Sequence, residues 1–191
     1  AQLQTIRMDG GNLSGANFSD AHFFGSRNFG DGGIVGGVSG GAGQGNYIPT
    51  ISYGDPLYFS GINFSGAKFV NTEFENVVID NSNMTYCDFS WAVVKPYPPS
   101  PQSYPFPRSQ FSKVNFANSK FMNAHLEGAD FQYSWFKDSK IDETTEIDQK
   151  WRMVFEIQNN RGAEGDYSGK DLSYANLRKS DLSAADLTEA N

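Results

Sequence analysis

The feature that most constrains this chain is a large apolar residue at every fifth position through its middle. Between residues 59 and 94 these residues are Phe59, Phe64, Phe69, Phe74, Ile79, Met84, Phe89 and Val94. A period of five fits neither the 3.6-residue turn of an α-helix nor the two-residue repeat of a β-strand. The chain is therefore expected to turn a corner in every repeat.

A second inward position is indicated two residues before each large one, where the side chains are mostly compact. These residues are Leu57, Ile62, Ala67, Thr72, Val77, Ser82, Cys87 and Ala92. If each pentapeptide forms one side of a square, four make a coil, and successive coils stack through backbone hydrogen bonds at roughly 4.8 Å. The large residue fills the interior, the compact one points in where space is short, and the other three positions face solvent.

The same pattern is clearest near the C-terminus, in KDLSYANLRKSDLSAADLTEAN, whereas Phe replaces Leu through most of the chain. This A(D/N)LXX pattern resembles that of the pentapeptide repeat proteins. The resemblance implies an all-β fold, a right-handed quadrilateral β-helix, as one solenoid over residues 1–191. It also implies a scaffold whose repeat carries no chemistry, and the string QKWRMVFEIQNN is similar to a segment of cyanobacterial or plastid members.

Two interruptions of the repeat are expected to leave the solenoid as extruded loops. Residues 30–56 are rich in glycine and contain too few large side chains to become ordered by burial. They are expected to form either a plain loop or a partner-binding loop. A phosphate-binding or calcium-binding loop is disfavoured because the residues that each motif requires are missing. Residues 95–108 hold six prolines, which remove backbone donors and favour polyproline II.

The third interruption, residues 142–165, has helical spacing and predicts an inserted α-helix near 145–160. Thr144 or Thr145 is placed to cap its start, and Gly162 to end it. Its apolar face is expected to consist of Ile147, Trp151, Val154 and Phe155.

Exposed aromatic residues form the candidate interaction surface. Three lie in the proline-rich loop and three at outward positions of the repeat: Tyr97, Tyr104, Phe106, Trp91, Tyr133 and Trp135. The loop either docks into an aromatic groove or folds its rings back over the solenoid. The outward aromatics are either covered by an insertion or available to a partner.

Catalytic, cofactor and metal sites are not indicated by the sequence. Cys87 lies at an inward position and is expected to be a buried thiol. His22 and His125 fall in different blocks, without a zinc-ligand spacing, and are expected to be surface residues. Lys170 departs from the pattern at an inward position, and its side chain is expected to reach solvent beside the third interruption.

Charge and hydropathy exclude further classes. The net charge of −7 argues against direct binding of nucleic acid or of an anionic membrane, and no apolar run is long enough for a membrane span. The sequence begins at Ala1, which fits a processed signal peptide. Together with the resemblance this favours the periplasm or thylakoid lumen, with the cytoplasm as the alternative.

Three hypotheses for function follow, from different classes. The first is a non-enzymatic scaffold that presents its loops, its helix and its aromatic patches to a protein partner or a larger assembly. The second is an acidic DNA mimic that inhibits a topoisomerase, as some members of the resembled family do, although lysines are interleaved with the acids. The third, an enzyme, is disfavoured. An open C-terminal coil further predicts that a partner, further chain or a second copy covers it end to end.

Overall fold

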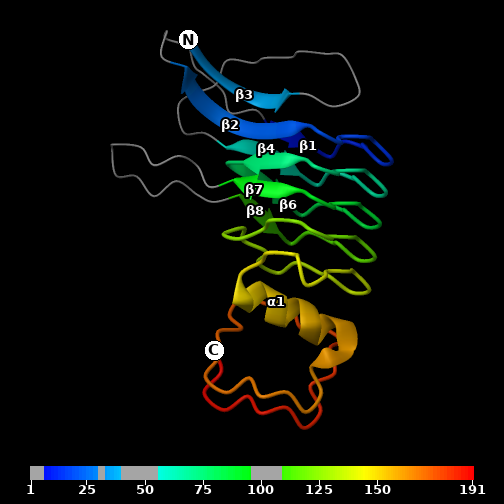
Figure 1. Cartoon of the computed structure of the whole chain (residues 1–191), viewed down its shortest axis with the longest axis vertical. Coiled ribbons are helices and arrows are strands. Elements are labelled where there is room, and N and C mark those ends of the chain that lie inside the picture. The colour runs from blue at the N-terminus through cyan, green and yellow to red at the C-terminus, as the bar shows by residue number, and fades with distance from the viewer. Residues whose placement is uncertain (1–6, 30–32, 40–55, 96–108) are drawn as a thin grey trace.

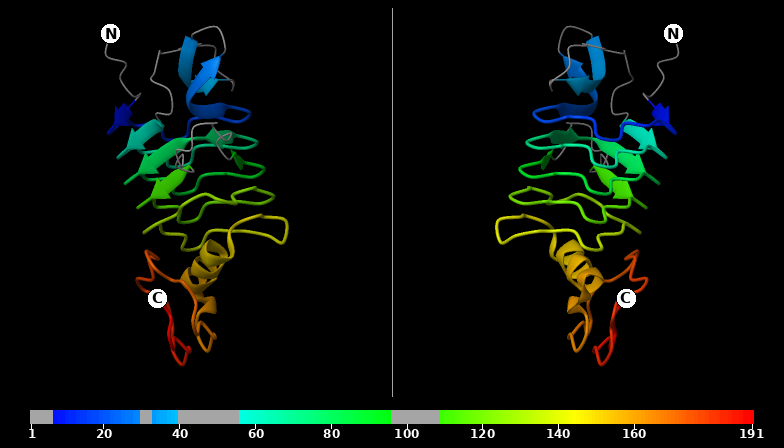
Figure 2. Two further views of the ribbon diagram at one scale, coloured as in Figure 1. Left: turned by 90° about the vertical axis from the view of Figure 1, so that its left-hand side faces the viewer. Right: turned by 90° about the vertical axis from the view of Figure 1, so that its right-hand side faces the viewer.

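The protein is a rod of stacked four-sided coils, described by a computed structural model for residues 7–29, 33–39, 56–95 and 109–191. Coil follows coil along the long axis from the N-terminal to the C-terminal end, and a helix crosses the rod before the last coils (Figure 1). Two side views show the same stacking (Figure 2). The structure confirms the predicted right-handed quadrilateral β-helix.

Short strands build two of the four sides. The first sheet is parallel throughout and has the order β1-β4-β6-β8. Its strands are Arg7–Asp9, Leu57–Ser60, Val77–Asp80 and Gln110–Ser112. The second sheet has the order β3-β2-β5-β7. Its strands are Gly33–Ser39, His22–Phe29, Glu73–Glu75 and Val93–Lys95.

We name the four sides walls A to D in the order the chain visits them, and define each by the central residues of its repeats. Wall A contains Phe59, Ile79, Phe111 and Phe131, and wall B contains Leu13, Phe64, Met84, Phe116 and Phe136. Wall C contains Phe18, Phe69, Phe89, Phe121 and Ile141, and wall D contains Phe23, Phe74, Val94, Leu126 and Ile147. Isolated parallel bridges join the coils of walls B and C.

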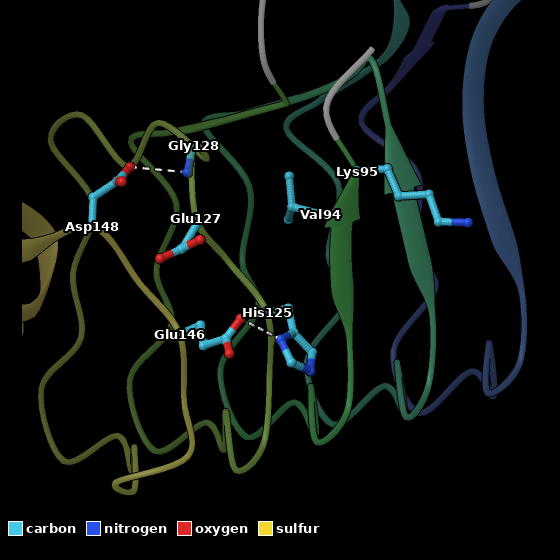
Figure 3. Close-up of a pocket in the computed structure, with 7 residues that line it drawn as sticks. All are labelled: Val94, Lys95, His125, Glu127, Gly128, Glu146 and Asp148. Atoms are coloured by element: carbon cyan, nitrogen blue, oxygen red, sulfur yellow. Dashed lines mark hydrogen bonds and ion pairs between the residues drawn. The ribbon is translucent and has the colours of Figure 1, made fainter. Parts of the chain in front are cut away.

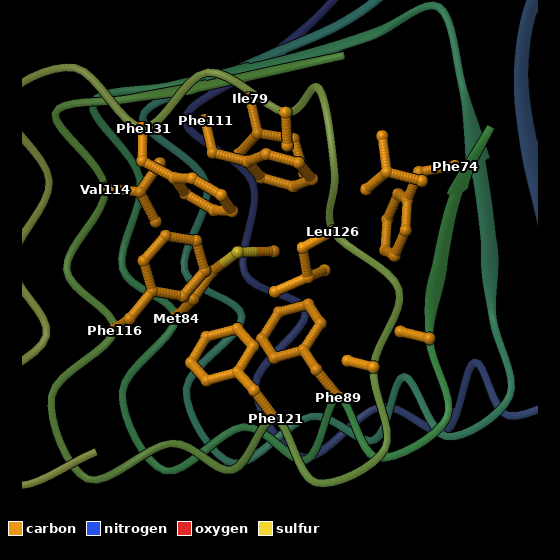
Figure 4. Packing of buried hydrophobic residues seen from close by; sticks show 14 of the residues in the cluster. Phe74, Ile79, Met84, Phe89, Phe111, Val114, Phe116, Phe121, Leu126 and Phe131 are labelled. Atoms are coloured by element: carbon orange, nitrogen blue, oxygen red, sulfur yellow. The ribbon is translucent and has the colours of Figure 1, made fainter. Parts of the chain in front are cut away.

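Phenylalanine rings fill the interior as vertical stacks. On wall C, the Phe69 ring lies parallel to the Phe89 ring with their centroids 4.8 Å apart, and Phe89 stacks in turn on Phe121 at 5.1 Å. Rings from neighbouring walls meet edge to face, as Phe116 and Phe121 do at 5.5 Å. Figure 4 shows several of these rings, among them Phe89, Phe116 and Phe121, converging inside the coils. Such aromatic pairs stabilise the core beyond their buried area.

Serines at the compact inward position also join successive coils. The Ser119 hydroxyl donates a hydrogen bond to the Met84 carbonyl at 2.7 Å, and accepts one from the Cys87 amide at 3.1 Å. The Ser134 hydroxyl bridges Phe111 and Val114 in the same way. Serine therefore suits this position because it satisfies buried backbone groups as well as being small.

The first interruption is not a loop throughout. Gly33–Ser39, which the sequence analysis assigned to a loop, forms β3 and pairs antiparallel with β2, with a register shift between Phe24 and Arg27. A hairpin satisfies its backbone groups through a neighbouring strand and needs few large side chains, so burial was the wrong criterion here. Residues 40–55 and 96–108 lie outside the described part of the chain.

The third interruption begins later than predicted. The repeat continues to Ile147 with one extra residue, so Thr145 is a buried inward residue whose hydroxyl donates to the Phe121 carbonyl at 2.8 Å. The predicted cap by Thr144 or Thr145 is therefore wrong, and Asp148 precedes the helix α1, Gln149–Glu156. Ile147 belongs to wall D, while Trp151, Val154 and Phe155 form the buried face of α1.

The helix ends in a single π-helical turn, Ile157–Arg161, followed by Gly162 as predicted. The reason for glycine is close approach, because a Cβ on Gly162 would lie 2.7 Å from the Asp181 carbonyl oxygen. The backbone there is right-handed, so glycine is not needed for its conformation.

Two amide side chains from the π-turn replace the missing backbone ladder below the last complete coil. Gln158 accepts from the Phe136 amide at 2.5 Å and donates to the carbonyls of Ser134 and Asn176, at 3.0 and 2.7 Å. Asn159 accepts from the Asp138 amide at 2.7 Å and donates to the Phe136 carbonyl at 3.0 Å. The helix thereby joins the phenylalanine-filled coils to the C-terminal block, residues 162–191.

Candidate interaction surface

The exposed aromatics occupy corners of the coil where the backbone is left-handed. Tyr86, Trp91, Tyr133 and Tyr174 have φ values of 59°, 63°, 58° and 61°, and their side chains are 66, 54, 47 and 55% exposed. Glycine, asparagine or aspartate is favoured in this conformation, which costs other residues roughly 1 kcal/mol. Some other corners of the rod follow that preference, as at Gly66, Asn71 and Asn118, whereas Lys113, Lys179 and Glu189 do not. Burial of the rings does not offset this cost.

The aromatics predicted to contact a partner lie on different edges. Trp91 is at the corner between walls C and D, diagonally opposite the corner between walls A and B that holds Tyr133. The Tyr133 ring meets the Tyr174 ring edge to face at 5.9 Å. Trp135 lies on wall B and is half-buried. The other three predicted residues, Tyr97, Tyr104 and Phe106, lie outside the described residues.

All three interruptions of the repeat fall at the same corner. The chain leaves wall D after Phe24, after Lys95 and after Ile147, at the corner between walls D and A. The first two interruptions end at wall A, and the third begins with the helix α1. In Figure 1 the corners on the opposite side of the rod follow one another without interruption. The insertions therefore decorate one edge and leave walls B and C as continuous repeats.

Charged side chains gather on wall D. His22 lies 3.6 Å from Glu73 and 3.5 Å from the buried Glu75, and the Lys95 ammonium contacts Glu73 at 2.7 Å. Lower on the same wall, His125 and Glu146 meet at 2.6 Å. Both histidines, which the sequence analysis placed on the surface, are thus paired with carboxylates, and His22 is only 22% exposed.

A shallow pocket of about 430 Å³ opens on this wall. Figure 3 shows its lining residues, Val94, Lys95, His125, Glu127, Gly128, Glu146 and Asp148, with Asp148 accepting a hydrogen bond from the Gly128 amide. His125 pairs with Glu146 inside the pocket, and Lys95 pairs with Glu73 beside it. Among the described residues that line it, no serine, threonine or cysteine is present as a nucleophile.

The remaining candidates for chemistry are structural. Burial raises the pKa of the Cys87 thiol to about 12, and its sulfur donates to the Phe64 carbonyl, so Cys87 is a buried thiol as predicted. Within the described residues, no three His, Cys, Asp or Glu side chains are placed to hold a metal ion. The described part of the chain also contains no helix suited to crossing a bilayer. Lys170 is exposed, as expected.

Aspartates before the central residue hold the corners in place. Asp166 and Asp186 each accept hydrogen bonds from the hydroxyl and then the backbone amide of the residue two positions on, which lowers the pKa of both carboxyl groups. At Asp171, hydrogen bonds from Lys150 and then Ser173 lower the pKa to about 2. These carboxylates are therefore turn and helix contacts, and no catalytic pair forms among them.

Three polar side chains that connect the helical segment to neighbouring coils were not predicted from the sequence: Asp148, Gln158 and Asn159. A helix pattern shows apolar spacing, and it says nothing of polar side chains that replace a backbone ladder. The sequence does contain one signal, the consecutive amides of QNN. They lie where the helix is predicted to end, shortly before the repeat resumes.

Comparison with known proteins agrees with this geometry. The sequence matches the family description "Pentapeptide repeats" in eight copies over residues 58–94, 109–145 and 168–191, just over half of the chain. The chain belongs to the pentapeptide repeat family. Members of this family are generally structural or interaction proteins. No curated protein matches the sequence of this chain.

The similar solved structures are also pentapeptide repeat proteins. Rfr23 from the cyanobacterium Cyanothece 51142 is 14% identical, with a TM-score of 0.28 over 74% of this chain and 91% of that one. HetL of Nostoc sp. strain PCC 7120, involved in heterocyst differentiation regulation, is 14% identical, with a TM-score of 0.23 over 99% and 86%. QnrB1, a plasmid-mediated fluoroquinolone resistance protein, is 11% identical, with a TM-score of 0.21 over 79% and 94%.

Proposed function

We propose that this protein is a non-enzymatic scaffold that binds another protein through the aromatic corners of its coils. The observation that carries the proposal is the placement of four large aromatic side chains at exposed left-handed corners. Strained backbone that burial does not compensate is typical of functional positions, and Tyr and Trp dominate the energetics of protein interfaces. The interior is filled with stacked rings, so binding has to use the outer surface.

The proline-rich loop is part of the same proposal. Residues 95–108 leave from the insertion-bearing corner, next to wall D, and their aromatics Tyr97, Tyr104 and Phe106 supply further contact area. The C-terminal coil is proposed as a second contact, end to end with another molecule. We place the protein in the periplasm or thylakoid lumen, with the cytoplasm as the alternative.

The test compares two variants with four substitutions each. The aromatic variant carries Tyr86→Asn, Trp91→Asn, Tyr133→Asn and Tyr174→Asn, and asparagine suits the left-handed backbone at each corner. The control variant carries asparagine at four left-handed corners that hold other residues: Lys113, Asp138, Lys179 and Glu189. Immobilised wild-type and control proteins should retain the same protein from a cyanobacterial lysate, identified by mass spectrometry.

The aromatic variant should retain at least tenfold less of that protein, since each aromatic anchor contributes on the order of 1 kcal/mol or more. A further variant, with residues 96–108 replaced by a short turn, should also bind less. Equal retention by all variants would overturn the proposal.

A DNA mimic that inhibits a topoisomerase is the second candidate, and the acidic character of wall D is the observation in its favour. Five carboxylates lie on this wall: Glu73, Glu75, Glu127, Glu146 and Asp148. The Lys95 ammonium neutralises part of that charge through its contact with Glu73. A DNA supercoiling assay with gyrase decides this candidate, because a mimic inhibits at micromolar concentration and a scaffold for another protein does not.

A further inference from the structure

Each wall of a complete coil presents a backbone carbonyl and a backbone amide to the coil below it. On wall C the Ser119 carbonyl accepts from the Lys140 amide, and the Phe121 amide donates to the Lys140 carbonyl, both at 2.9 Å. On wall B of the last complete coil, residues 129–147, the Gln158 side chain takes over both of these bonds. A side chain thus replaces the ladder on wall B at the point where the ladder stops.

Wall C of the same coil has no such replacement. The Ser139 carbonyl and the Ile141 amide stand at its lower edge, and neither has a hydrogen-bond partner among the residues that the structure describes. Below wall A, in contrast, the buried Trp151 packs against Phe131. An open ladder edge is a template for pairing with another extended chain, because buried or bound backbone groups require partners.

A cavity of about 250 Å³ adjoins this open edge. The described residues that line it are Met122, Ser139, Lys140, Ile141, Phe155, Glu156 and Asn159. Helix α1 forms one side of the cavity through Phe155 and Glu156. In both side views the last complete coil, drawn in yellow, projects sideways beyond this helix (Figure 2). The edge therefore combines unpaired backbone groups with space for an apolar side chain beside Ile141 and Phe155.

The outward residues of wall C indicate the charge of an occupant. Parallel bridges join Lys68, Asp88, Lys120 and Lys140 in one column, so that Asp88 lies between two lysines. Lys120 and Lys140 are then direct neighbours of like charge, at the end of the column. Opposite charges stabilise neighbouring strands, and like charges do the reverse. An acidic side chain in the next position would lie beside Lys140, whereas Glu156 disfavours a second acidic residue on the helix side.

We propose that the lower edge of wall C binds an extended segment of a partner protein, which adds one strand to this wall. The segment has an aspartate or glutamate in register with Lys140, followed directly by an apolar residue such as leucine. Its backbone pairs with the Ser139 carbonyl and the Ile141 amide, and its apolar side chain enters the cavity beside Phe155. This surface is separate from the aromatic corners, so either proposal can fail without the other.

The first test measures hydrogen exchange of single amides by NMR in the full-length protein. The Ile141 amide should exchange much faster than the Phe121 amide, which is paired one coil above it. The probe is an octapeptide with blocked ends, ANADLSGA. An excess of this peptide should slow exchange of the Ile141 amide roughly tenfold or more, because the amide gains an acceptor. The Phe121 amide should not change.

The second test reverses the charge at the edge. In 0.15 M salt, the wild type should bind the aspartate peptide roughly fivefold more tightly than the lysine peptide ANAKLSGA, the scale of an exposed charge pair. Lys140→Glu should invert this preference. Lys68→Glu has the same net charge and lies in the same column three coils higher, so it should keep the wild-type preference. Both lysines are exposed, and circular dichroism verifies that both variants are folded.

Three results would overturn the proposal. They are an Ile141 amide as protected as that of Phe121 in the free protein, no response of the Ile141 amide to the aspartate peptide, and an unchanged preference in Lys140→Glu. Sedimentation provides a fourth. If the wild type dimerises, Lys140→Glu stays monomeric and the peptide does not bind, the edge pairs with a second copy of this chain and the proposed partner segment is wrong.

Discussion

The coils above the helix and the block below it follow the same five-residue repeat, but they bury their central side chains to different degrees. In residues 57–147 the central phenylalanines are buried to within a few per cent, with Phe64 and Phe69 wholly inaccessible. In the C-terminal block the central residues are Tyr167 and four leucines, of which Leu187 is 43% exposed. The repeat thus sets the path of the chain in both regions, while the central side chains are enclosed more completely in the upper coils.

The two regions also differ in how they are held. The upper coils share continuous ladders on four walls, whereas the C-terminal block pairs mainly within itself, as in Tyr167 to Asp186 at 2.8 Å. Its contacts to the coils above include Gln158, the Tyr133 amide and the ion pair of Lys150 with Asp171. Regions with few buried apolar contacts open at lower free energy than the core. We therefore expect the C-terminal block to unfold first.

The largest expected effect comes from removing a ring in the upper coils. Phe116→Ala should lower the free energy of unfolding by about 3–5 kcal/mol, because its buried ring touches rings from both neighbouring walls. Leu182→Ala, in the C-terminal block, should cost about 1 kcal/mol because that side chain is already part-exposed. Urea unfolding measures both. Equal losses would remove the distinction between the two regions.

Next in size is the link between the regions. Gln158→Leu leaves the Phe136 amide and the Ser134 and Asn176 carbonyls without this partner, and should cost about 2–3 kcal/mol. Hydrogen exchange followed by mass spectrometry should show faster exchange in residues 162–191 and little change in residues 57–94. Gln149→Leu, at an exposed position of the same helix, is the control. Faster exchange throughout the rod would mean that the two regions unfold together.

A smaller effect of opposite sign is expected at an aromatic corner. Trp91→Asn replaces an exposed ring with a residue that tolerates the left-handed backbone, so the protein should become more stable by about 0.5–1 kcal/mol. The change is measured by the midpoint of urea unfolding. Destabilisation would show that the Trp91 ring is part of the packing of the upper coils, and would count against its role in binding.

The smallest expected effect is a loss of stability at acidic pH. The pKa of Asp171 is lowered to about 2 in the folded protein, so its contribution to stability is present above the ordinary value near 3.9 and is lost as the pH falls towards 2. The C-terminal block should therefore loosen in acid before the upper coils do. Lys150→Met removes the main cause and should bring the Asp171 pKa back towards its ordinary value, as measured by NMR titration. An ordinary pKa for Asp171 in the wild type would refute this contact.

Much of the fold was predictable because the five-residue period is a direct consequence of stacking. Phe64, Phe69 and Phe74 were placed on successive walls from spacing alone, and the buried Cys87 followed from the same count. The hairpin of β3 and the start of α1 were not predictable in this way. Gly33–Ser39 is held by backbone pairing, and Thr145 reads equally as a helix cap or as a compact inward residue.

The surface was less predictable than the interior. The outward positions of Trp91 and Tyr133 follow from the repeat. Their placement on diagonally opposite corners does not, because it depends on which wall each block resumes on after an insertion. The pairing of His125 with Glu146, and the asparagine column that begins at Asn12, depend on the same register. Residues from different blocks meet on one wall, and their alignment depends on how many residues each insertion contains.

The stacking of residues from successive coils is tested most directly by a disulfide bond between them. Asn63 and Asn83 are paired in neighbouring coils of wall B, at a separation that suits a disulfide, about 4.4–6.8 Å between Cα atoms. Asn63→Cys/Asn83→Cys should form an intramolecular disulfide under mild oxidation, detected by mass spectrometry, while the native Cys87 stays reduced. Asn63→Cys/Lys68→Cys, on adjacent walls of one coil, should not. A disulfide in the second variant and none in the first would contradict the coil-over-coil arrangement.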